Sequence, residues 1–80
     1  MISSEILLSL DEHLEVFKNS SGVCVYYKNA ETKDGYFLKT EWGAGENFES
    51  ACDDYLNKIR GKKLVFNACT SYRKEVIVIG

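Results

Sequence analysis

The sequence has no apolar run near the ~20 residues that a membrane-spanning helix requires, and no basic segment followed by an apolar run of signal-peptide length. We therefore expect a cytoplasmic protein that makes no membrane contact. The chain also has no proline and only three cysteines, which lie far apart. An odd number of isolated cysteines argues against a disulfide framework and fits a reducing compartment, where cysteine acts as a small apolar residue.

Residues able to ligate a metal are few and scattered. His13 is the only histidine, and Cys24, Cys52 and Cys69 are each isolated, whereas structural zinc sites draw their ligands as close pairs. The same isolation argues against a nucleophilic cysteine activated by His13, which we expect to be a surface residue of a helix. We expect no metal, no cofactor and no catalytic residue, and therefore no enzyme.

A glycine-containing segment, Gly43-Ala-Gly45-Glu-Asn47, is superficially similar to a phosphate-binding loop. It lacks the third glycine and the lysine that such loops use. Glu46 would also place a negative charge where a phosphate should lie. We interpret the segment as a flexible turn from a strand into a helix.

The residues that are present favour a folded domain. The chain has 80 residues, of which 45% are hydrophobic, with five Tyr, four Phe and one Trp. Disordered chains are poor in such residues. We expect residues 1–80 to form a single small α+β domain. A domain of this size buries only about 60–65% of the surface of its unfolded chain and is close to the lower size limit for folding alone. The chain could therefore also form a dimer.

The N-terminal segment has apolar residues at helical spacing. This spacing predicts one amphipathic helix over residues 4–18, which Asn19-Ser-Ser-Gly22 would end. Ser9-Leu-Asp-Glu12 also has the pattern of a capping box, which leaves a second interpretation open. In that interpretation the helix starts late and Ile2–Leu8 is extended. The apolar positions are Ile6, Leu7, Leu10, Leu14 and Phe17.

Two segments rich in β-branched and aromatic residues, Val23–Asn29 and Tyr36–Trp42, predict strands. The turn-favouring pair Asp34-Gly35 lies between them, so we expect a hairpin. Gly43-Ala-Gly45 would break its second strand.

A second helix is predicted to follow Asn47, a favourable N-cap residue, and to end at Gly61. Two further strands, Leu64–Cys69 and Glu75–Ile79, are expected after it, joined by the polar residues 70–74. The sequence leaves open whether residues 76–79 lie centrally in the sheet or at an edge, where they could pair across a dimer. The apolar face of the predicted helix consists of Phe48, Cys52, Tyr55, Leu56 and Ile59.

The predicted order of elements is α-β-β-α-β-β. Because each helix must bury one apolar stripe, we expect a four-stranded, mainly antiparallel sheet with two helices on one face, which is a two-layer sandwich. Pleat alternation then assigns each strand residue to a face. The residues predicted to face the helices are Val23, Val25, Tyr27, Leu38, Trp42, Leu64 and Phe66. Those predicted on the open face are Cys24, Tyr26, Lys28, Phe37, Lys39, Val65, Asn67 and Cys69.

Charge is unevenly distributed along the chain. Residues 1–54 contain four Lys and eleven Asp or Glu, for a net charge of −7, whereas residues 55–80 contain six Lys or Arg and one Glu, for +5. On the predicted open face, a semi-apolar patch edged by lysines is typical of a surface that meets a partner. The predicted contact residues are Tyr26, Lys28, Phe37 and Lys39 on the sheet, and Glu49 and Asp53 on the second helix.

We interpret the chain as a non-enzymatic protein-binding module, such as an inhibitor, an immunity-type protein or a regulatory protein. Its partner would be another protein, with a second copy of the chain included. The alternative is a nucleic-acid-binding domain that uses the sheet face and the basic C-terminal third. That alternative predicts retention on heparin and a steep loss of affinity with salt.

Part of the chain, from Val23 to Ile59, resembles small antitoxin domains of the HicB type. The resemblance consists of a β-hairpin leading to the helix start Asn47-Phe-Glu-Ser-Ala51. The chain lacks the proline-rich strand end of that family and has an additional predicted N-terminal helix. We therefore transfer no site residue, and the sequence identifies no family.

Overall fold

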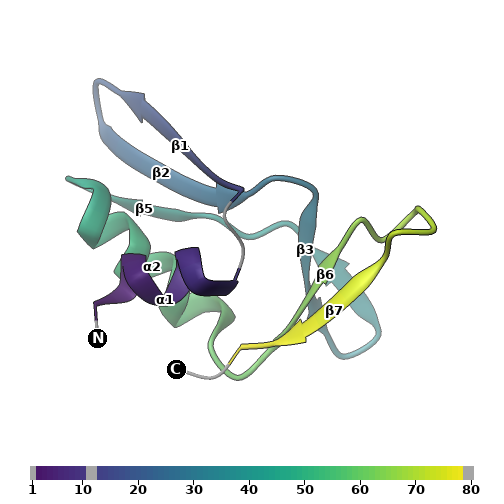
Figure 1. Ribbon diagram of the computed structural model, residues 1–80. Helices are drawn as coiled ribbons and strands as arrows, with labels where there is room; N and C mark the ends of the chain where they lie inside the picture. The colour runs from purple at the N-terminus through teal and green to yellow at the C-terminus, as the bar shows by residue number, and fades with distance from the viewer. Residues whose placement is uncertain (1, 11–12, 79–80) are drawn as a thin grey trace.

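The computed structural model describes residues 2–10 and 13–78, which form two helices and two antiparallel sheets (Figure 1). In chain order the elements are α1 (Ser3–Leu10), β1 (Leu14–Asn19), β2 (Gly22–Tyr27), β3 (Ala30–Asp34), β4 (Phe37–Lys39), β5 (Gly43–Gly45), α2 (Phe48–Ile59), β6 (Lys63–Phe66) and β7 (Lys74–Ile77). Sheet A has the strand order β1-β2-β5, and sheet B has the order β4-β3-β6-β7. The α+β class is confirmed, whereas the single four-stranded sheet predicted from the sequence is wrong.

Both helices lie on one side of sheet A (Figure 1). α2 packs against β2 and β5, and α1 packs against α2. Val23, Val25 and Tyr27 point toward this side and are buried, because every second residue of a strand faces the same way. The predicted packing of two helices on one face is therefore found in part: both helices lie on the same side of sheet A, but α2 contacts the strands and α1 packs mainly on α2.

The predicted helix over residues 4–18 is wrong in its second half. α1 ends at Leu10, and residues 14–19 form β1, which pairs with β2 along its whole length. Asn19-Ser-Ser-Gly22 forms the turn of this hairpin, in which Asn19 Oδ1 accepts a hydrogen bond from the Ser21 N–H at 2.7 Å. The ladder with β2 decides the conformation, because strand formation depends on cross-strand neighbours that a local pattern does not reveal.

The alternative interpretation, in which Ile2–Leu8 is extended, is also wrong, since residues 3–10 are helical. The hydroxyl of Ser9 donates to the carbonyl of Ile6 at 2.7 Å, within the helix that it was proposed to start. Glu12 of the proposed capping box lies outside the described residues. His13 is exposed, as predicted, but it precedes a strand and does not belong to a helix.

The segments Val23–Asn29 and Tyr36–Trp42 do not pair as a hairpin. β2 pairs with β1 on one side and with β5 on the other. Asn29, with a φ of +63°, lies where the chain leaves β2 and enters β3. β3 then forms its own hairpin with β4, so Asp34-Gly35 is a turn as predicted but joins two strands of sheet B.

The predicted strand break at Gly43-Ala-Gly45 is wrong, because these residues form β5. A Cβ added at Gly43 would lie 2.6 Å from the backbone N of Tyr55, and one added at Gly45 would lie 2.6 Å from the backbone N of Ala51. No side chain fits at such distances without moving the strand away from α2. Glycine is therefore required here for close approach of two backbones.

The second helix agrees with its prediction. Asn47 is the N-cap: its Oδ1 accepts from the Ser50 N–H at 2.9 Å, and the Ser50 hydroxyl accepts from the Asn47 N–H at 3.1 Å. This reciprocal pair is a capping box. Gly61, one residue beyond the C-cap, has a φ of +78°, which glycine adopts without strain. The buried residues of α2 are Ala51, Cys52, Tyr55, Leu56 and Ile59.

The last two strands exist but are shifted from their predicted bounds. The predicted strand Leu64–Cys69 ends early, since β6 stops at Phe66 and Asn67 adopts a φ of +54°. Cys69 therefore lies in the loop. The predicted strand Glu75–Ile79 corresponds to β7, which is an edge strand of sheet B. Ile79 lies outside the described residues.

Leu38 and Trp42 were assigned by alternation to the helix side, and this prediction is wrong. Their side chains are 38% and 52% exposed. Residues 36–42 do not form one strand, so a single alternation does not apply to them. Leu38 lies on β4 at an edge of sheet B, and Trp42 lies just before β5 of sheet A.

Val65 was predicted on the open face but is fully buried. Its neighbours in the sheet register are Glu31 on β3 and Glu75 on β7. The Glu75 carboxylate pairs with Lys63 Nζ at 3.4 Å and with Arg73 Nη2 at 3.2 Å. Long charged side chains cover apolar surface with their stems, so we attribute the burial of Val65 to these neighbours.

Tyr27 joins the two sheets and both helices in one core. Its ring centroid lies 5.6 Å from that of Tyr55 and 5.5 Å from that of Phe66. Its hydroxyl donates to the carbonyl of Leu7 on α1. Its N–H lies beyond the end of β5 and donates instead to the Tyr55 hydroxyl at 3.2 Å. Phe66 and Leu64 are buried, as predicted.

Candidate binding surface

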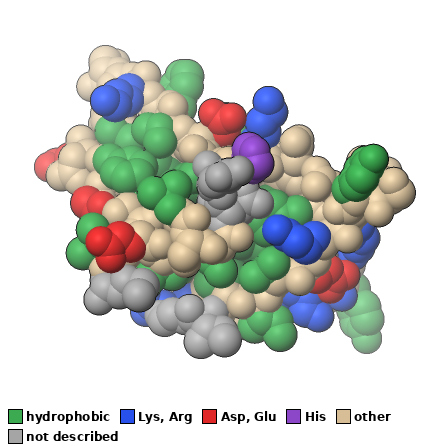
Figure 2. Space-filling view, in the orientation of Figure 1, with side chains coloured by type: hydrophobic (Ala, Val, Ile, Leu, Met, Phe, Trp, Pro, Cys, Tyr) green, Lys and Arg blue, Asp and Glu red, His purple; other side chains and the backbone are tan. Residues whose placement is uncertain are grey.

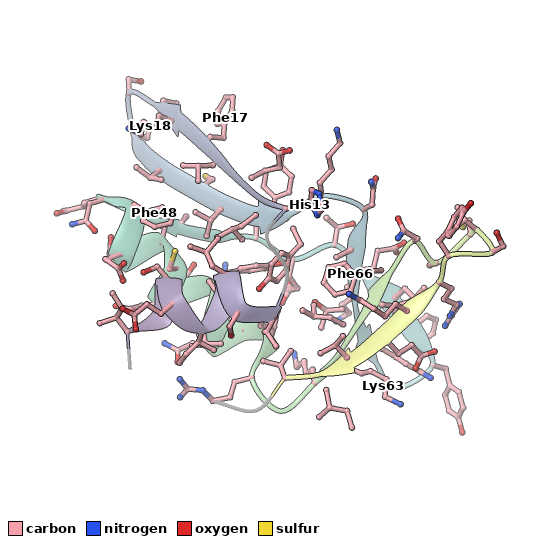
Figure 3. All side chains as sticks on the ribbon, in the orientation of Figure 1. His13, Phe17, Lys18, Phe48, Lys63 and Phe66 are labelled. Atoms are coloured by element: carbon pink, nitrogen blue, oxygen red, sulfur yellow. The ribbon has the colours of Figure 1, made fainter. Side chains whose placement is uncertain are left out.

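The side of sheet A opposite the helices carries exposed apolar side chains. In the ladder of β1 and β2, Phe17 lies opposite Cys24, and Glu15 lies opposite Tyr26. Because these positions alternate with buried ones, they point away from the helices, as Figure 3 shows for Phe17. Phe17 is 58% exposed and Tyr26 is 37% exposed. We call this surface the outer face of sheet A, and it consists of Phe17, Cys24, Tyr26, Trp42 and Ala44.

A shallow hollow of about 300 Å³ lies on this face. Its lining is mainly apolar, and Glu41 is the charged residue among the lining residues. A hollow of this size and character accepts one apolar side chain of a partner more readily than a charged metabolite. It is lined by Phe17, Cys24, Tyr26, Thr40, Glu41 and Trp42.

A second, larger groove of about 520 Å³ adjoins the hollow where the two sheets meet. Tyr26 and Thr40 line both depressions. The groove is more polar, because Lys28 and Glu31 line it from one side and the loop after β6 lines it from the other. An apolar hollow thus adjoins a polar groove. Protein interfaces have the same composition, with an apolar centre and a polar rim.

Side chains of α2 hold the edge of the candidate surface. The Ala44 N–H donates to Asp54 Oδ2 at 2.9 Å, and Lys58 Nζ donates to the Trp42 carbonyl at 2.9 Å. Lys58 Nζ also lies 3.1 Å from Asp54 and 5.8 Å from the centroid of the Trp42 ring. The hydrogen bond from Ala44, followed by the contact with Lys58, lowers the pKa of Asp54 below its ordinary value of 3.8. Asp54 is therefore ionised at neutral pH and keeps this contact.

The predicted contact residues of the sheet are not brought together. Tyr26 lies on the outer face of sheet A, and Lys28 lines the adjoining groove. Phe37 and Lys39 lie on β4 of sheet B, where Lys39 is opposite the buried Thr32. The single patch predicted from one four-stranded sheet is therefore wrong, and a role of Phe37 and Lys39 in binding stays a prediction.

Glu49 and Asp53 connect the two helices. The hydroxyl of Ser4 donates to the Glu49 carboxylate, and the hydroxyl of Ser3 donates to the Asp53 carboxylate. These contacts fix α1 on α2. Burial, with a smaller contribution from the two carboxylates, raises the pKa of Cys52 to about 11, so this thiol stays protonated. Contact of Glu49 and Asp53 with a partner stays a prediction.

The sequence interpretation missed Phe17 and Trp42. Phe17 was assigned to a helix because it continues the helical spacing from Leu14. The competing signal was short: the apolar-polar-apolar order of Leu14, Glu15 and Val16 fits a half-buried strand, but the apolar Phe17 interrupts the alternation. Trp42 carried no local signal, since its exposure follows from the division into two sheets.

Within residues 2–10 and 13–78, no group of three or more His, Cys, Asp or Glu side chains is placed to hold a metal ion. The three cysteines have different environments: Cys52 is buried, Cys24 is partly buried and Cys69 is exposed. In the same part of the chain, no helix has both the length and the apolar character needed to cross a bilayer.

The part of the chain around sheet B is basic, whereas the rest of the described chain is acidic. Sheet B and its loops, residues 28–40 and 61–78, contain seven Lys or Arg and three Asp or Glu, for a net charge of +4. The remaining described residues contain three Lys or Arg and seven Asp or Glu, for −4. On the face shown in Figure 2, acidic side chains gather near the helices and basic ones over sheet B. Such a separation orients an approaching charged partner.

Comparison with known proteins identifies no relative. No protein-family model matches the chain, and no curated protein or solved structure matches it. The resemblance of residues 23–59 to antitoxin domains of the HicB type thus gains no support from a family match.

Proposed function

We propose that the protein is a non-enzymatic protein-binding module that uses the outer face of sheet A. One observation carries this proposal: Phe17 and Trp42 flank an apolar hollow on an open sheet face, and both side chains are more than half exposed. Exposed aromatic side chains grouped in this way are typical of contact surfaces. Binding by such a surface suits an inhibitor, an immunity-type protein or a regulatory protein.

The chemistry of the surface indicates the kind of partner. The aromatic residues Tyr26 and Trp42 belong to the types that dominate binding energies when they become buried. Glu15 lies opposite Tyr26 in the ladder, and Glu41 lines the hollow. The part of the chain around sheet A is also acidic overall. The surface therefore fits a partner with an apolar side chain at its centre and basic residues around it.

The test compares two pairs of substitutions in quantitative cross-linking and capture. Phe17→Ser with Trp42→Ser alters the outer face of sheet A, and Tyr36→Ser with Phe37→Ser removes two exposed aromatic residues of sheet B as the matched control. Loss of a central aromatic contact costs about 2 kcal/mol or more, which is roughly 30-fold in affinity. We expect the first variant to capture at least tenfold less partner protein than the wild type does, and the control variant to capture the same amount as the wild type.

Circular dichroism must show that both variants are folded. Equal capture by the wild type and by a folded Phe17→Ser, Trp42→Ser variant would contradict the proposal. If only the Tyr36→Ser, Phe37→Ser variant lost capture, the contact surface would lie on sheet B and not on sheet A.

A second candidate function, nucleic-acid binding, is favoured by the charge of sheet B. Its net charge of +4 is accompanied by the exposed rings of Tyr36, Phe37 and Tyr72. Cations that hold phosphates and rings that stack on bases are the usual elements of single-strand binding. A Lys33→Ala, Lys63→Ala variant would then lose salt-sensitive binding to an oligonucleotide, whereas Phe17→Ser, Trp42→Ser would retain it.

A further inference from the structure

We propose that β1 pairs antiparallel with β1 of a second copy of this chain, which gives a homodimer with one continuous six-stranded sheet of order β5-β2-β1-β1-β2-β5. The proposal concerns the edge of sheet A, and it is independent of the partner proposed for the outer face.

Among the strands that the structure describes, none pairs with β1 on the side away from β2. Lys28 N–H donates to the His13 carbonyl at 3.4 Å, which identifies residues 13 and 28 as a hydrogen-bonded pair of the ladder. Hydrogen-bonded and non-bonded pairs alternate in an antiparallel ladder. The backbone groups of residues 15, 17 and 19 therefore face β2, and those of Leu14, Val16 and Lys18 face outward from the sheet edge.

The opposite edge of sheet A is closed by side chains. Asp54 accepts from the outward N–H of Ala44, and Lys58 donates to the outward carbonyl of Trp42. The edges of sheet B are short: β4 has three residues, and β7 has four with adjacent charges at Lys74 and Glu75. Short and charged strands are usual protections of an edge. Within the described strands, β1 is the edge that combines six residues with outward backbone groups.

This edge is complementary to itself. A two-fold axis through Val16, perpendicular to the sheet, places each Val16 opposite Val16 of the partner subunit. The same axis places Leu14 opposite Lys18 of the partner subunit, and Lys18 opposite the partner's Leu14. All three outward residues of each chain are then paired, and the interface has six backbone hydrogen bonds. Even-numbered residues meet even-numbered ones, so the helix side and the outer face each stay continuous.

Side chains on both faces of β1 favour a second copy. Val16 is 44% exposed on the helix side, and Phe17 is 58% exposed on the outer face. Figure 2 shows apolar side chains gathered between the β1–β2 hairpin and α1, where Leu10 and Phe48 are only partly buried. The two-fold axis would place two such apolar regions side by side, with the Val16 pair between them.

The register is tested by single cysteines in a Cys24→Ser, Cys69→Ser background, in which Cys52 stays buried. Across the axis, the two Val16 Cα atoms would lie about 5.5 Å apart, which suits a disulfide. The two Lys18 Cα atoms would be offset by four residues, or about 13 Å along the strands. We expect Val16→Cys to form a disulfide-linked dimer on mild oxidation. Lys18→Cys, which places the cysteine on the same edge and face, should form at least tenfold less of this linked dimer. Equal linkage of the two variants would overturn the register.

The role of the backbone is tested by Val16→Pro. Proline removes an N–H that points away from β2, and therefore leaves the ladder within the monomer intact. Val16→Thr keeps the N–H and is the matched control. By light scattering at about 100 µM, we expect the wild type and Val16→Thr near twice the chain mass of 9.1 kDa, and Val16→Pro near 9.1 kDa with an unchanged circular dichroism spectrum.

A monomeric wild type at that concentration, or a folded Val16→Pro variant that stays dimeric, would overturn the proposal. Neither result decides the capture experiment on the outer face of sheet A, because that experiment measures the binding of a different protein.

Discussion

Replacing Tyr27 with alanine is expected to lower the free energy of unfolding by about 3–5 kcal/mol, the usual cost of truncating a buried aromatic residue. Tyr27 is 2% exposed and contacts the rings of Tyr55 and Phe66. The substitution would leave a cavity where the two sheets meet. It would also remove the hydroxyl donor of the Leu7 carbonyl. Because small domains are stable by only about 5–15 kcal/mol, this loss would remove a large part of the free energy of unfolding. Urea denaturation followed by circular dichroism measures the change.

The control for this experiment is Tyr36→Ala, which removes an equal side chain from a fully exposed position in the β3–β4 turn. Surface substitutions of this kind usually change stability by less than about 0.5 kcal/mol. If Tyr27→Ala costs no more than Tyr36→Ala, then Tyr27 does not join the two sheets in a common core.

Gly43→Val is expected to lower the free energy of unfolding by about 3 kcal/mol, at the upper end of the usual cost of overpacking. A Cβ at this position would lie 2.6 Å from the backbone N of Tyr55. That contact is to backbone in the middle of a helix, so it cannot be relieved by rotating a side chain. The strand and α2 must separate, and Tyr55 would lose part of its packing.

Ala44→Val is the matched control, because it adds the same type of side chain one residue further along β5. Ala44 is exposed and faces the outer side of sheet A, where a β-branched residue is well tolerated. We expect its stability to change by less than about 0.5 kcal/mol. Equal effects of the two substitutions, measured by thermal and urea unfolding, would show that β5 does not pack closely on α2.

Local sequence signals predicted α2 well. The cap at Asn47, the apolar stripe and the glycine after the helix all lie within one segment and act in that segment. β1 was predicted incorrectly because Leu10, Leu14 and Phe17 fit a helical period, while the strand becomes favourable only through pairing with β2. That pairing partner is not encoded locally.

The division into two sheets was also not predictable from local patterns. β5 is a three-residue strand with two glycines, and such a segment has low strand propensity. It becomes a strand because the two glycines allow its backbone to approach α2. With β5 in sheet A, the hairpin of β3 and β4 is free to pair with β6 in a different sheet.

The candidate surface was predictable only in part. The alternation of β2 placed Tyr26 on an open face, and the structure agrees. Phe17 and Trp42 could not be assigned to that face, since one was placed in a helix and the other in a different strand. Phe37 was assigned to the same face because one sheet was assumed.

The most direct test of β1 as an open edge strand is amide hydrogen exchange resolved by residue over positions 14–19. The measurement is made at a dilution where light scattering shows a monomer. We expect slow exchange at Glu15 and Phe17, whose N–H groups face β2, and fast exchange at Val16 and Lys18, whose N–H groups face outward. Uniform protection of consecutive amides through residues 14–18, as in a helix, would contradict the assignment of β1 and with it the outer face of sheet A.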